Sequence, residues 1–175
     1  DPGASIVYGQ KTKNKEELQE MINQDKWDDI YKKYPVADGD FVYLPAGCLH
    51  AMGKGNVVYE IQQSTDVTYR FYDYHRKDKD GNERELHLKQ AIDCLSFDKD
   101  IDKNDVHPVV KVHENMKETI FISNDSFTVS QLLVIGKCQY KCDNYQLATV
   151  VKGSGKVDEY DVKVGDNFLI PTNTS

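Results

Sequence analysis

Hydrophobic and polar residues along the chain follow two periods, one typical of helices and one typical of strands. Residues 5–9 form a short apolar run that predicts a strand. The next apolar residues, Leu18, Met21 and Ile22, recur at helical spacing. From Val36 onward most apolar runs are short, rich in Val and Tyr, and separated by turns that contain glycine. The pattern therefore predicts a mainly β chain with a short helical insert.

Three helices are expected. The first follows Asn14, which with Glu17 three residues later has the pattern of an N-cap and its partner. The second begins near Asp25 and ends before Pro35, because the residue before a proline disfavours helix. The third lies within residues 85–95, where apolar side chains share one helical face.

Strands are expected wherever β-branched and aromatic runs lie between turns. The expected ranges are 41–44, 56–63, 67–74, 118–123, 127–135, 147–152, 156–160 and 167–171. The Asp-rich residues 97–105 fit an exposed connector. The second half of the chain is therefore predicted to be an antiparallel sandwich or barrel.

Charge and composition narrow the function classes. A net charge of −7 and a pI near 5.2 argue against nucleic-acid binding, which needs a clustered basic surface. No apolar run is long enough to cross a bilayer, so no membrane is expected as a partner. The four cysteines form no C-x-x-C pair, which favours free thiols in a reducing cytoplasm; a Cys138–Cys142 disulfide is the alternative in an oxidising compartment.

One pattern occurs twice. Residues 36–45 and 162–171 share V-x-x-G-D-x-x-x-[LI]-P. Gly-Asp favours a tight turn, the apolar residues after it favour a strand, and Pro suits the strand's end. The repeat predicts two similar barrels, although a common hairpin corner would give the same letters.

The first copy continues to His50 as Gly39-x5-Pro45-x-Gly47-x2-His50. That string resembles the second motif of the cupin superfamily, in which the closing strand delivers a metal-binding histidine into a small β-barrel. The resemblance implies cupin-type jelly-roll barrels in tandem, the first incomplete. We expect residues 1–96 to form the C-terminal part of a catalytic barrel with a helical insert. Residues 97–112 then form a connector, and residues 113–175 a second, smaller barrel truncated at its end.

The polar residues after His50 alternate with apolar ones. Glu60, Gln62 and Ser64 share one face of an extended chain, where they would line a cavity or face water. Asp66 and Arg70 lie four residues apart and share a face on an unbroken strand. An isolated surface ion pair is the alternative interpretation.

Three strings then give a closer resemblance: PAGCLHAMGKG at 45–55, EIQQSTDVTYRFYDYHR at 60–76 and RELHLKQAI at 84–92. Together they resemble the type I mannose-6-phosphate isomerases, particularly the short bacterial form. The family interconverts mannose 6-phosphate and fructose 6-phosphate with one bound zinc. The resemblance implies that His50 is a zinc ligand and Arg70 the catalytic arginine. It also implies that Asp66 is an acidic active-site residue and Glu60 a carboxylate on the same strand.

Aldose–ketose isomerisation moves a proton between C1 and C2 through a cis-enediolate, so it needs a base and a cation near the sugar oxygens. Asp66, Glu60 or a residue outside this chain can be the base. Catalytic zinc usually has three protein ligands, and no histidine precedes His50. The chain is therefore expected to be an internal fragment that is inactive alone, in which zinc is missing or incompletely coordinated.

The remaining polar residues carry weaker expectations. The basic side chains nearest the motifs, candidates for contact with phosphate or else solvated, are Lys54, Arg76, Lys77, Lys79 and Arg84. Surface or hydrogen-bonded imidazoles are expected at His75, His87, His107 and His113, and structural aromatics at Tyr72 and Tyr74.

The expected partner is a small sugar phosphate, and no oligomeric state is predicted. The alternative function is a non-catalytic cupin paralogue that binds sugar phosphates. A metal-dependent cupin oxygenase is disfavoured because the chain has no His-x-His cluster.

Overall fold

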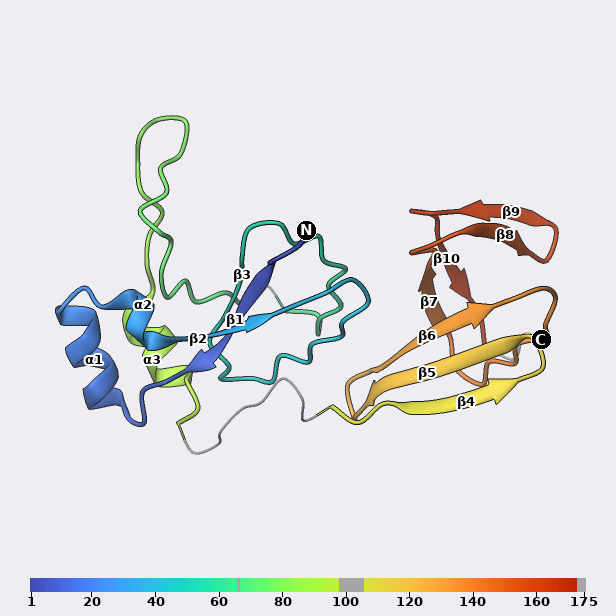
Figure 1. The fold of residues 1–175 in the computed structure, drawn as a ribbon, viewed down its shortest axis with the longest axis horizontal. Helices are drawn as coiled ribbons and strands as arrows, with labels where there is room; N and C mark the ends of the chain where they lie inside the picture. The colour runs from blue at the N-terminus through green and yellow to red at the C-terminus, as the bar shows by residue number, and fades with distance from the viewer. Residues whose placement is uncertain (66, 98–105, 173–175) are drawn as a thin grey trace. The chain divides into compact units, whose positions relative to one another are not determined.

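The computed structural model describes residues 1–65, 67–97 and 106–172 (Figure 1). The chain forms two compact units. Unit 1 comprises residues 1–110 and 119–131, and unit 2 comprises residues 111–118 and 132–175. In the described ranges strands clearly outnumber helices, so the predicted mainly β character is confirmed.

Unit 1 is built on an antiparallel sheet with the strand order β2-β1-β3. The strands are β1 (Ser5–Gln10), β2 (Tyr31–Pro35) and β3 (His50–Met52). The central strand β1 pairs Ile6 with Tyr34 on one side and Tyr8 with His50 on the other. Alternate residues of β1 enter two different apolar clusters, as the period of a strand requires.

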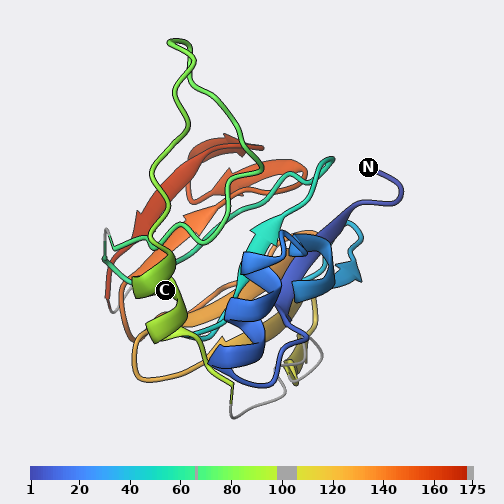
Figure 2. The same cartoon turned by 90° about the vertical axis from the view of Figure 1, so that its left-hand side faces the viewer.

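Three helices belong to unit 1: α1 (Lys15–Asn23), α2 (Trp27–Ile30) and α3 (Leu88–Cys94). Figures 1 and 2 show α1 and α3 side by side. They contribute to the larger apolar cluster, whose buried members are Val7, Leu18, Ile30, Tyr31, Leu49, Phe71, Ala91 and Ile92. The opposite face of β1 supplies Ile6 and Tyr8 to a smaller cluster with Cys48. β1 is therefore covered on both faces.

A three-stranded sheet with the order β4-β5-β6 follows, made of β4 (Val109–His113), β5 (Met116–Ser123) and β6 (Thr128–Val134). In unit 2, β7 (Gln146–Thr149) pairs with β10 (Asn167–Ile170). β8 (Ser154–Val157) and β9 (Tyr160–Lys163) form a hairpin. These strands confirm the strand-rich second half of the chain.

The prediction of a second helix up to Pro35 was wrong beyond Ile30. α2 is a single turn, and residues 31–35 form the edge strand β2 instead. The burial of these residues roughly alternates along the chain, as expected for a strand. Tyr31 and Lys33 pair with residues of β1 in a backbone ladder that a helix cannot form. Pro35 ends this strand at its pairing with Ser5.

Three predicted strands are not formed: residues 41–44, 56–63 and 67–74 lie outside the strands of the structure. Their apolar side chains include Val57 and Val67, which are 102% and 62% exposed. An alternating pattern shows that a segment could bury one side in a sheet, but a strand also needs a neighbouring strand that forms hydrogen bonds with it. None of the described strands pairs with these three segments.

The predicted strand at 156–160 is two strands. Val157 pairs directly with Tyr160, which leaves a two-residue turn between β8 and β9. Asp158, in this turn, has a φ of 53°, the left-handed conformation typical of tight hairpins. The short polar pair Asp158-Glu159 is thus a turn inside an otherwise strand-like run.

The predicted division of the chain at a 97–112 connector stays a prediction. Residues 98–105 of that connector lie outside the described residues. β4 begins at Val109, within the range given to the connector.

Candidate functional site

His50 lies at the start of β3, opposite Tyr8, and its side chain is exposed. Its Nδ1 lies 3.0 Å from the carbonyl oxygen of Cys48. Because a carbonyl oxygen can only accept, this hydrogen bond requires a proton on Nδ1, and a neutral ring with that proton presents a lone pair on Nε2. A histidine that binds a metal through one nitrogen commonly donates from the other to such an acceptor. The geometry of His50 therefore fits one metal ligand.

The turn before His50 is held against α3. Gly47 has a φ of 79°, and a Cβ there would lie 2.8 Å from the carbonyl oxygen of Cys94. Its own carbonyl accepts a hydrogen bond from the Ser96 amide at 3.0 Å. Only glycine suits both the backbone conformation and this close approach. The glycine of the PAGCLH string thus allows this turn to approach the end of α3 closely.

Arg70 is half-buried, and three hydrogen bonds join it to residues 85–87. Its Nη1 donates to the Glu85 carbonyl at 2.9 Å. Its amide donates to His87 Nδ1 at 3.1 Å, and its carbonyl accepts from the His87 amide at 2.8 Å. The guanidinium is therefore tied to the chain that leads into α3.

Of the two carboxylates predicted for the site, Glu60 and Asp66, the structure describes only Glu60. Glu60 is exposed, and residue 66 lies outside the described residues. The assignment of roles to His50, Arg70, Asp66 and Glu60 stays a proposal.

A complete metal site is not present in the part of the chain that the structure describes, where no three His, Cys, Asp or Glu side chains lie close enough to hold an ion. His75 lies 3.5 Å from Glu83 and makes an edge contact with Tyr72. The residues present thus fit one ligand of a zinc ion and not its whole coordination shell.

Two of the candidate phosphate-binding residues are engaged with a carboxylate. The Asp73 side chain is only 6% exposed, and both Arg84 and Arg76 bind it. Arg84 Nε donates to Oδ2 at 2.7 Å and Arg76 Nε to Oδ1 at 3.1 Å. The Arg84 guanidinium, helped by Arg76, holds the pKa of the Asp73 carboxyl well below its usual range.

This arrangement supports a turn of unusual backbone conformation. Tyr74 and His75 follow each other with φ values of 54° and 52°. The left-handed conformation is costly for side chains of this kind, so it needs support from its surroundings. Asp73 and Arg76 bracket the turn, and the Arg76 amide donates to the Asp73 carbonyl at 3.0 Å. Sequence spacing gave no signal for this arrangement, because Arg84 is eleven residues from Asp73.

Tyr72 has the structural role that was expected of it. Its ring stacks on Trp27 with the ring centres 4.2 Å apart and the planes 10° apart. Trp27 also contacts Phe71 edge-on, with the centres 5.7 Å apart. These contacts attach the two residues that follow Arg70 to α2. Tyr74 is tilted against Tyr72 and half-exposed.

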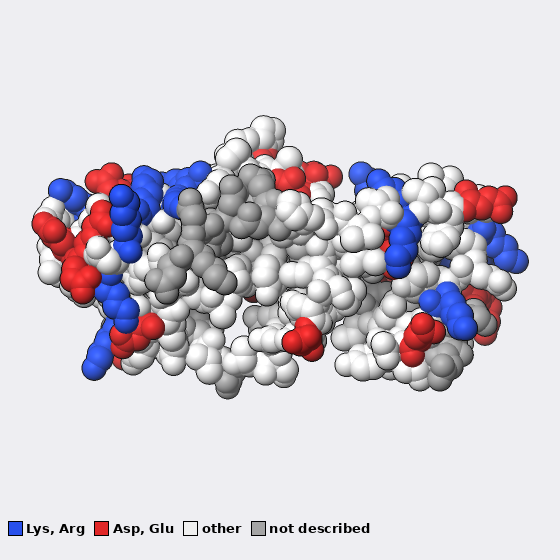
Figure 3. Space-filling model, turned by 90° about the horizontal axis from the view of Figure 1, so that it is seen from below, with Lys and Arg blue, Asp and Glu red and all other residues white. Residues whose placement is uncertain are grey.

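Charged side chains of both signs are interspersed on the face drawn in Figure 3. Lys54, Lys77 and Lys79 are exposed. Their contact with phosphate stays a prediction.

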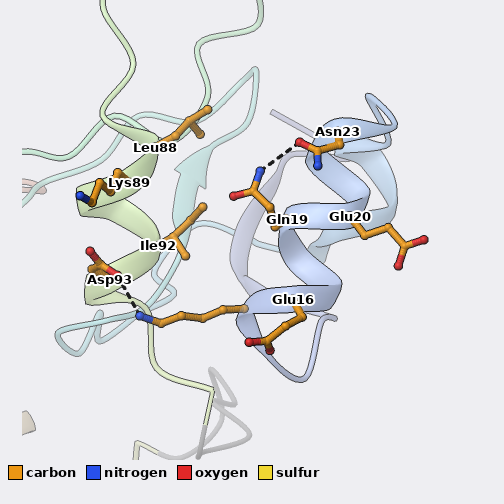
Figure 4. A pocket seen from close by; sticks show the side chains of 9 residues that line it. Glu16, Gln19, Glu20, Asn23, Leu88, Lys89, Ile92 and Asp93 are labelled. Carbon is orange, nitrogen blue, oxygen red and sulfur yellow. Dashed lines mark hydrogen bonds and ion pairs between the residues drawn. The ribbon is translucent and has the colours of Figure 1, made fainter.

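An open cavity of about 750 Å³ lies between α1 and α3 (Figure 4). Lys15 and Asp93 form an ion pair of 2.9 Å from one helix to the other. The lining includes Glu16, Glu20 and Lys89, but neither His50 nor Arg70. This cavity is therefore separate from the two residues that were predicted to act on the substrate and the metal.

Comparison with known proteins identifies the relatives of this chain. No protein-family model matches it. Mannose-6-phosphate isomerase of Streptococcus mutans is 38% identical over 98% of the chain, and mannose-6-phosphate isomerase ManA of Bacillus subtilis is 37% identical over 96%. The chain is homologous to mannose-6-phosphate isomerases. The crystal structure of the B. subtilis mannose-6-phosphate isomerase matches 98% of the chain with a TM-score of 0.90 and 32% identity.

The chain matches only part of the length of these relatives. The chain covers 55% of the S. mutans mannose-6-phosphate isomerase and 55% of the B. subtilis crystal structure. It therefore spans about half the length of the curated relatives. No helix in the described ranges is long and apolar enough to cross a membrane. All four cysteines have free thiols.

Proposed function

We propose that this chain serves in an aldose–ketose isomerase that interconverts mannose 6-phosphate and fructose 6-phosphate. The observation that carries the proposal is the match along 98% of the chain to proteins named mannose-6-phosphate isomerase. The substrate is a small sugar phosphate, and the protein works in the cytoplasm, which the free thiols favour. The fold is that of tandem cupin-type barrels.

His50 is the zinc ligand that this chain contributes. Its Nδ1 contact with the Cys48 carbonyl keeps Nε2 available and supports this role. Bound zinc supplies Lewis-acid polarisation of a sugar oxygen. The remaining ligands come from outside the described residues, because these contain no group of three ligand side chains.

Arg70 stabilises the negative charge that develops on the enediolate. A guanidinium keeps its charge at every relevant pH and holds an oxyanion through paired N–H groups. The bond from Nη1 to the Glu85 carbonyl limits the motion of the guanidinium. Glu60 and Asp66 are the carboxylates of this chain that are candidates to move the proton between C1 and C2.

The test is fructose 6-phosphate formation by the complete protein with added Zn²⁺. In Arg70→Met we expect kcat to fall by about 10²–10³-fold, the usual loss for one oxyanion donor. Lys152→Met, which removes an exposed cation in unit 2, is the matched control and should keep full activity. Unchanged turnover in Arg70→Met would remove its catalytic role. Binding of sugar phosphate without any turnover by the zinc-loaded protein would favour the non-catalytic paralogue.

A further inference from the structure

His87 and Arg70 are joined at the point where the chain enters α3. The two residues exchange hydrogen bonds, from the Arg70 amide to His87 Nδ1 and from the His87 amide to the Arg70 carbonyl. The Glu85 carbonyl adds a third bond, to the Arg70 guanidinium. The segment 85–87 therefore fixes both the backbone and the charged end of Arg70.

The chemistry of the imidazole explains why a histidine suits this position. A backbone amide can only donate, so His87 Nδ1 must carry a lone pair and the ring proton lies on Nε2. His87 occupies the N-cap position of α3, but its side chain makes no cap hydrogen bond. The ring accepts a hydrogen bond from the Arg70 amide and does not cap the helix.

His87 is attached to a rigid part of unit 1. Its carbonyl accepts from the Ala91 amide at 2.8 Å, in the first turn of α3. Ala91 and Ile92 are buried in the larger apolar cluster. The rings of His87 and Tyr69 lie in an edge-type arrangement, with the ring centres 6.4 Å apart. The imidazole of His87 thus connects Arg70 to a helix that is packed in the apolar core.

We propose that His87 is a positioning residue that holds Arg70 in the orientation needed for isomerisation. The inference rests on the proposed function, in which Arg70 stabilises the enediolate. His87 itself touches neither substrate nor metal. Small displacements of a catalytic group cost as much as about 10²-fold in rate, so the loss of this contact should appear in kcat.

The first test uses variants of the complete protein assayed with mannose 6-phosphate. His87→Leu removes the acceptor, and we expect kcat to fall by about 10-fold to 100-fold with KM changed by less than about threefold. His87→Asn places an amide oxygen near the position of Nδ1 and should restore kcat to within about threefold of the wild type. An unimpaired His87→Leu enzyme, or an Asn variant as impaired as the Leu variant, would overturn the proposal.

A double variant separates this proposal from the proposed function. If His87 acts through Arg70, adding His87→Leu to Arg70→Met costs no further activity. Multiplied losses mean that His87 acts by another route and overturn the inference. A full loss in Arg70→Met with no loss in His87→Leu leaves the isomerase function standing and removes only the role of His87. An unaffected Arg70→Met enzyme removes the proposed function first.

A spectroscopic test does not depend on activity or on how well the Leu variant folds. Long-range ¹H–¹⁵N correlation spectra of the folded protein distinguish the two neutral tautomers of a histidine. We expect His87 as the Nε2–H tautomer, with Nδ1 unprotonated. A ring protonated on Nδ1 cannot accept from the Arg70 amide and would contradict the proposal.

Discussion

At the scale of single residues, the start of α1 forms the contacts that its sequence predicted. Asn14 Oδ1 accepts from the Glu17 amide at 2.8 Å, and Glu17 Oε2 accepts from the Lys13 amide at 2.8 Å. The first bond satisfies a backbone donor in the first turn that the helix leaves unpaired, and the second satisfies the amide of the residue before the N-cap. The predicted N-cap is confirmed, because its partners lie within four residues of each other.

Asn14→Ala should lower the free energy of unfolding by about 1 kcal/mol, since it removes the acceptor for the Glu17 amide. Urea unfolding followed by Trp27 fluorescence measures the change. Asn23→Ala is the matched control at the other end of α1, where only a side-chain bond with Gln19 is lost, and it should stay within about 0.5 kcal/mol. Equal effects of both substitutions would contradict a capping role for Asn14.

Asp73 contributes stability that depends on pH. The pKa of its carboxyl is lowered in the folded protein by Arg84 and Arg76, while an unfolded aspartate titrates at about 3.9. The stabilisation is therefore fully present above pH 5 and is lost as the pH falls below the unfolded value. A protonated Asp73 resembles an asparagine in shape and charge.

Asp73→Asn should be clearly less stable than the wild type at pH 7, and the difference should shrink as the pH falls toward 2. Thermal unfolding at a series of pH values measures it. Asp143→Asn removes an exposed carboxylate and is the control, with little difference at any pH. A difference for Asp73→Asn that does not change with pH would mean that its ion pairs do not stabilise the fold.

At the scale of elements, the internal repeat is a repeated turn. In the first copy the Ala37 amide donates to Asp40 Oδ2 at 3.0 Å, and in the second the Lys163 amide donates to Asp166 Oδ2 at 2.8 Å. The reverse backbone bonds, from the Asp40 amide to Ala37 and from the Asp166 amide to Lys163, are also formed in both. The shared letters therefore encode the same local geometry in each unit.

The glycines of these turns are needed for their backbone conformation. Gly39 and Gly165 have φ values of 88° and 92°, and a Cβ on either would meet no atom within 4 Å. Gly39→Ala and Gly165→Ala should each cost about 1–2 kcal/mol of unfolding free energy from backbone strain alone. Gly155, which has open space and no positive φ, is the control, and its alanine variant should show no loss. Similar losses at all three positions in denaturant unfolding would argue against strain as the cause.

The strands after the two turns differ. Asn167–Ile170 pairs with β7 along its whole length, whereas residues 41–44 form no strand. Phe41 instead stacks on Phe121, with ring centres 4.6 Å apart. A turn forms from four residues, but a strand depends on a neighbour that the turn does not specify.

At the scale of the whole molecule, apolar burial is uneven. Unit 1 holds both apolar clusters, whereas the buried apolar residues described in unit 2 are Met116 and Cys142. Leu147 and Leu169, on the paired strands of unit 2, are 78% and 58% exposed. Since apolar burial is the main favourable term in folding, we expect unit 2 to be the less stable unit.

Urea should therefore unfold unit 2 of this chain before unit 1. The single tryptophan, Trp27, reports on unit 1, and the methyl resonances of Leu147 and Leu169 report on unit 2. We expect the methyl transition at a lower urea concentration than the fluorescence transition. Coincident midpoints would show that the two units unfold as one cooperative structure.

Much of the fold and part of the candidate site could be predicted from the sequence. The N-cap, the paired turns, the helix before Cys94 and most strands of the second half rest on neighbours within a few residues. These features need only short-range bonds and backbone preferences, which the order of residues already contains. The role of His50 stays a prediction, which rests on the resemblance of Gly39-x5-Pro45-x-Gly47-x2-His50 to a cupin motif.

Only the tertiary structure decided the features that depend on distant partners. Residues 31–35 became a strand because β1 pairs with them, and residues 56–63 did not because no described strand pairs along them. The bond from Arg70 to His87 joins residues seventeen positions apart, and the ion pair of Arg84 with Asp73 joins residues eleven positions apart. The sequence shows which kinds of contact a side chain can make, but the tertiary fold of the backbone decides which distant residue lies close enough to make it.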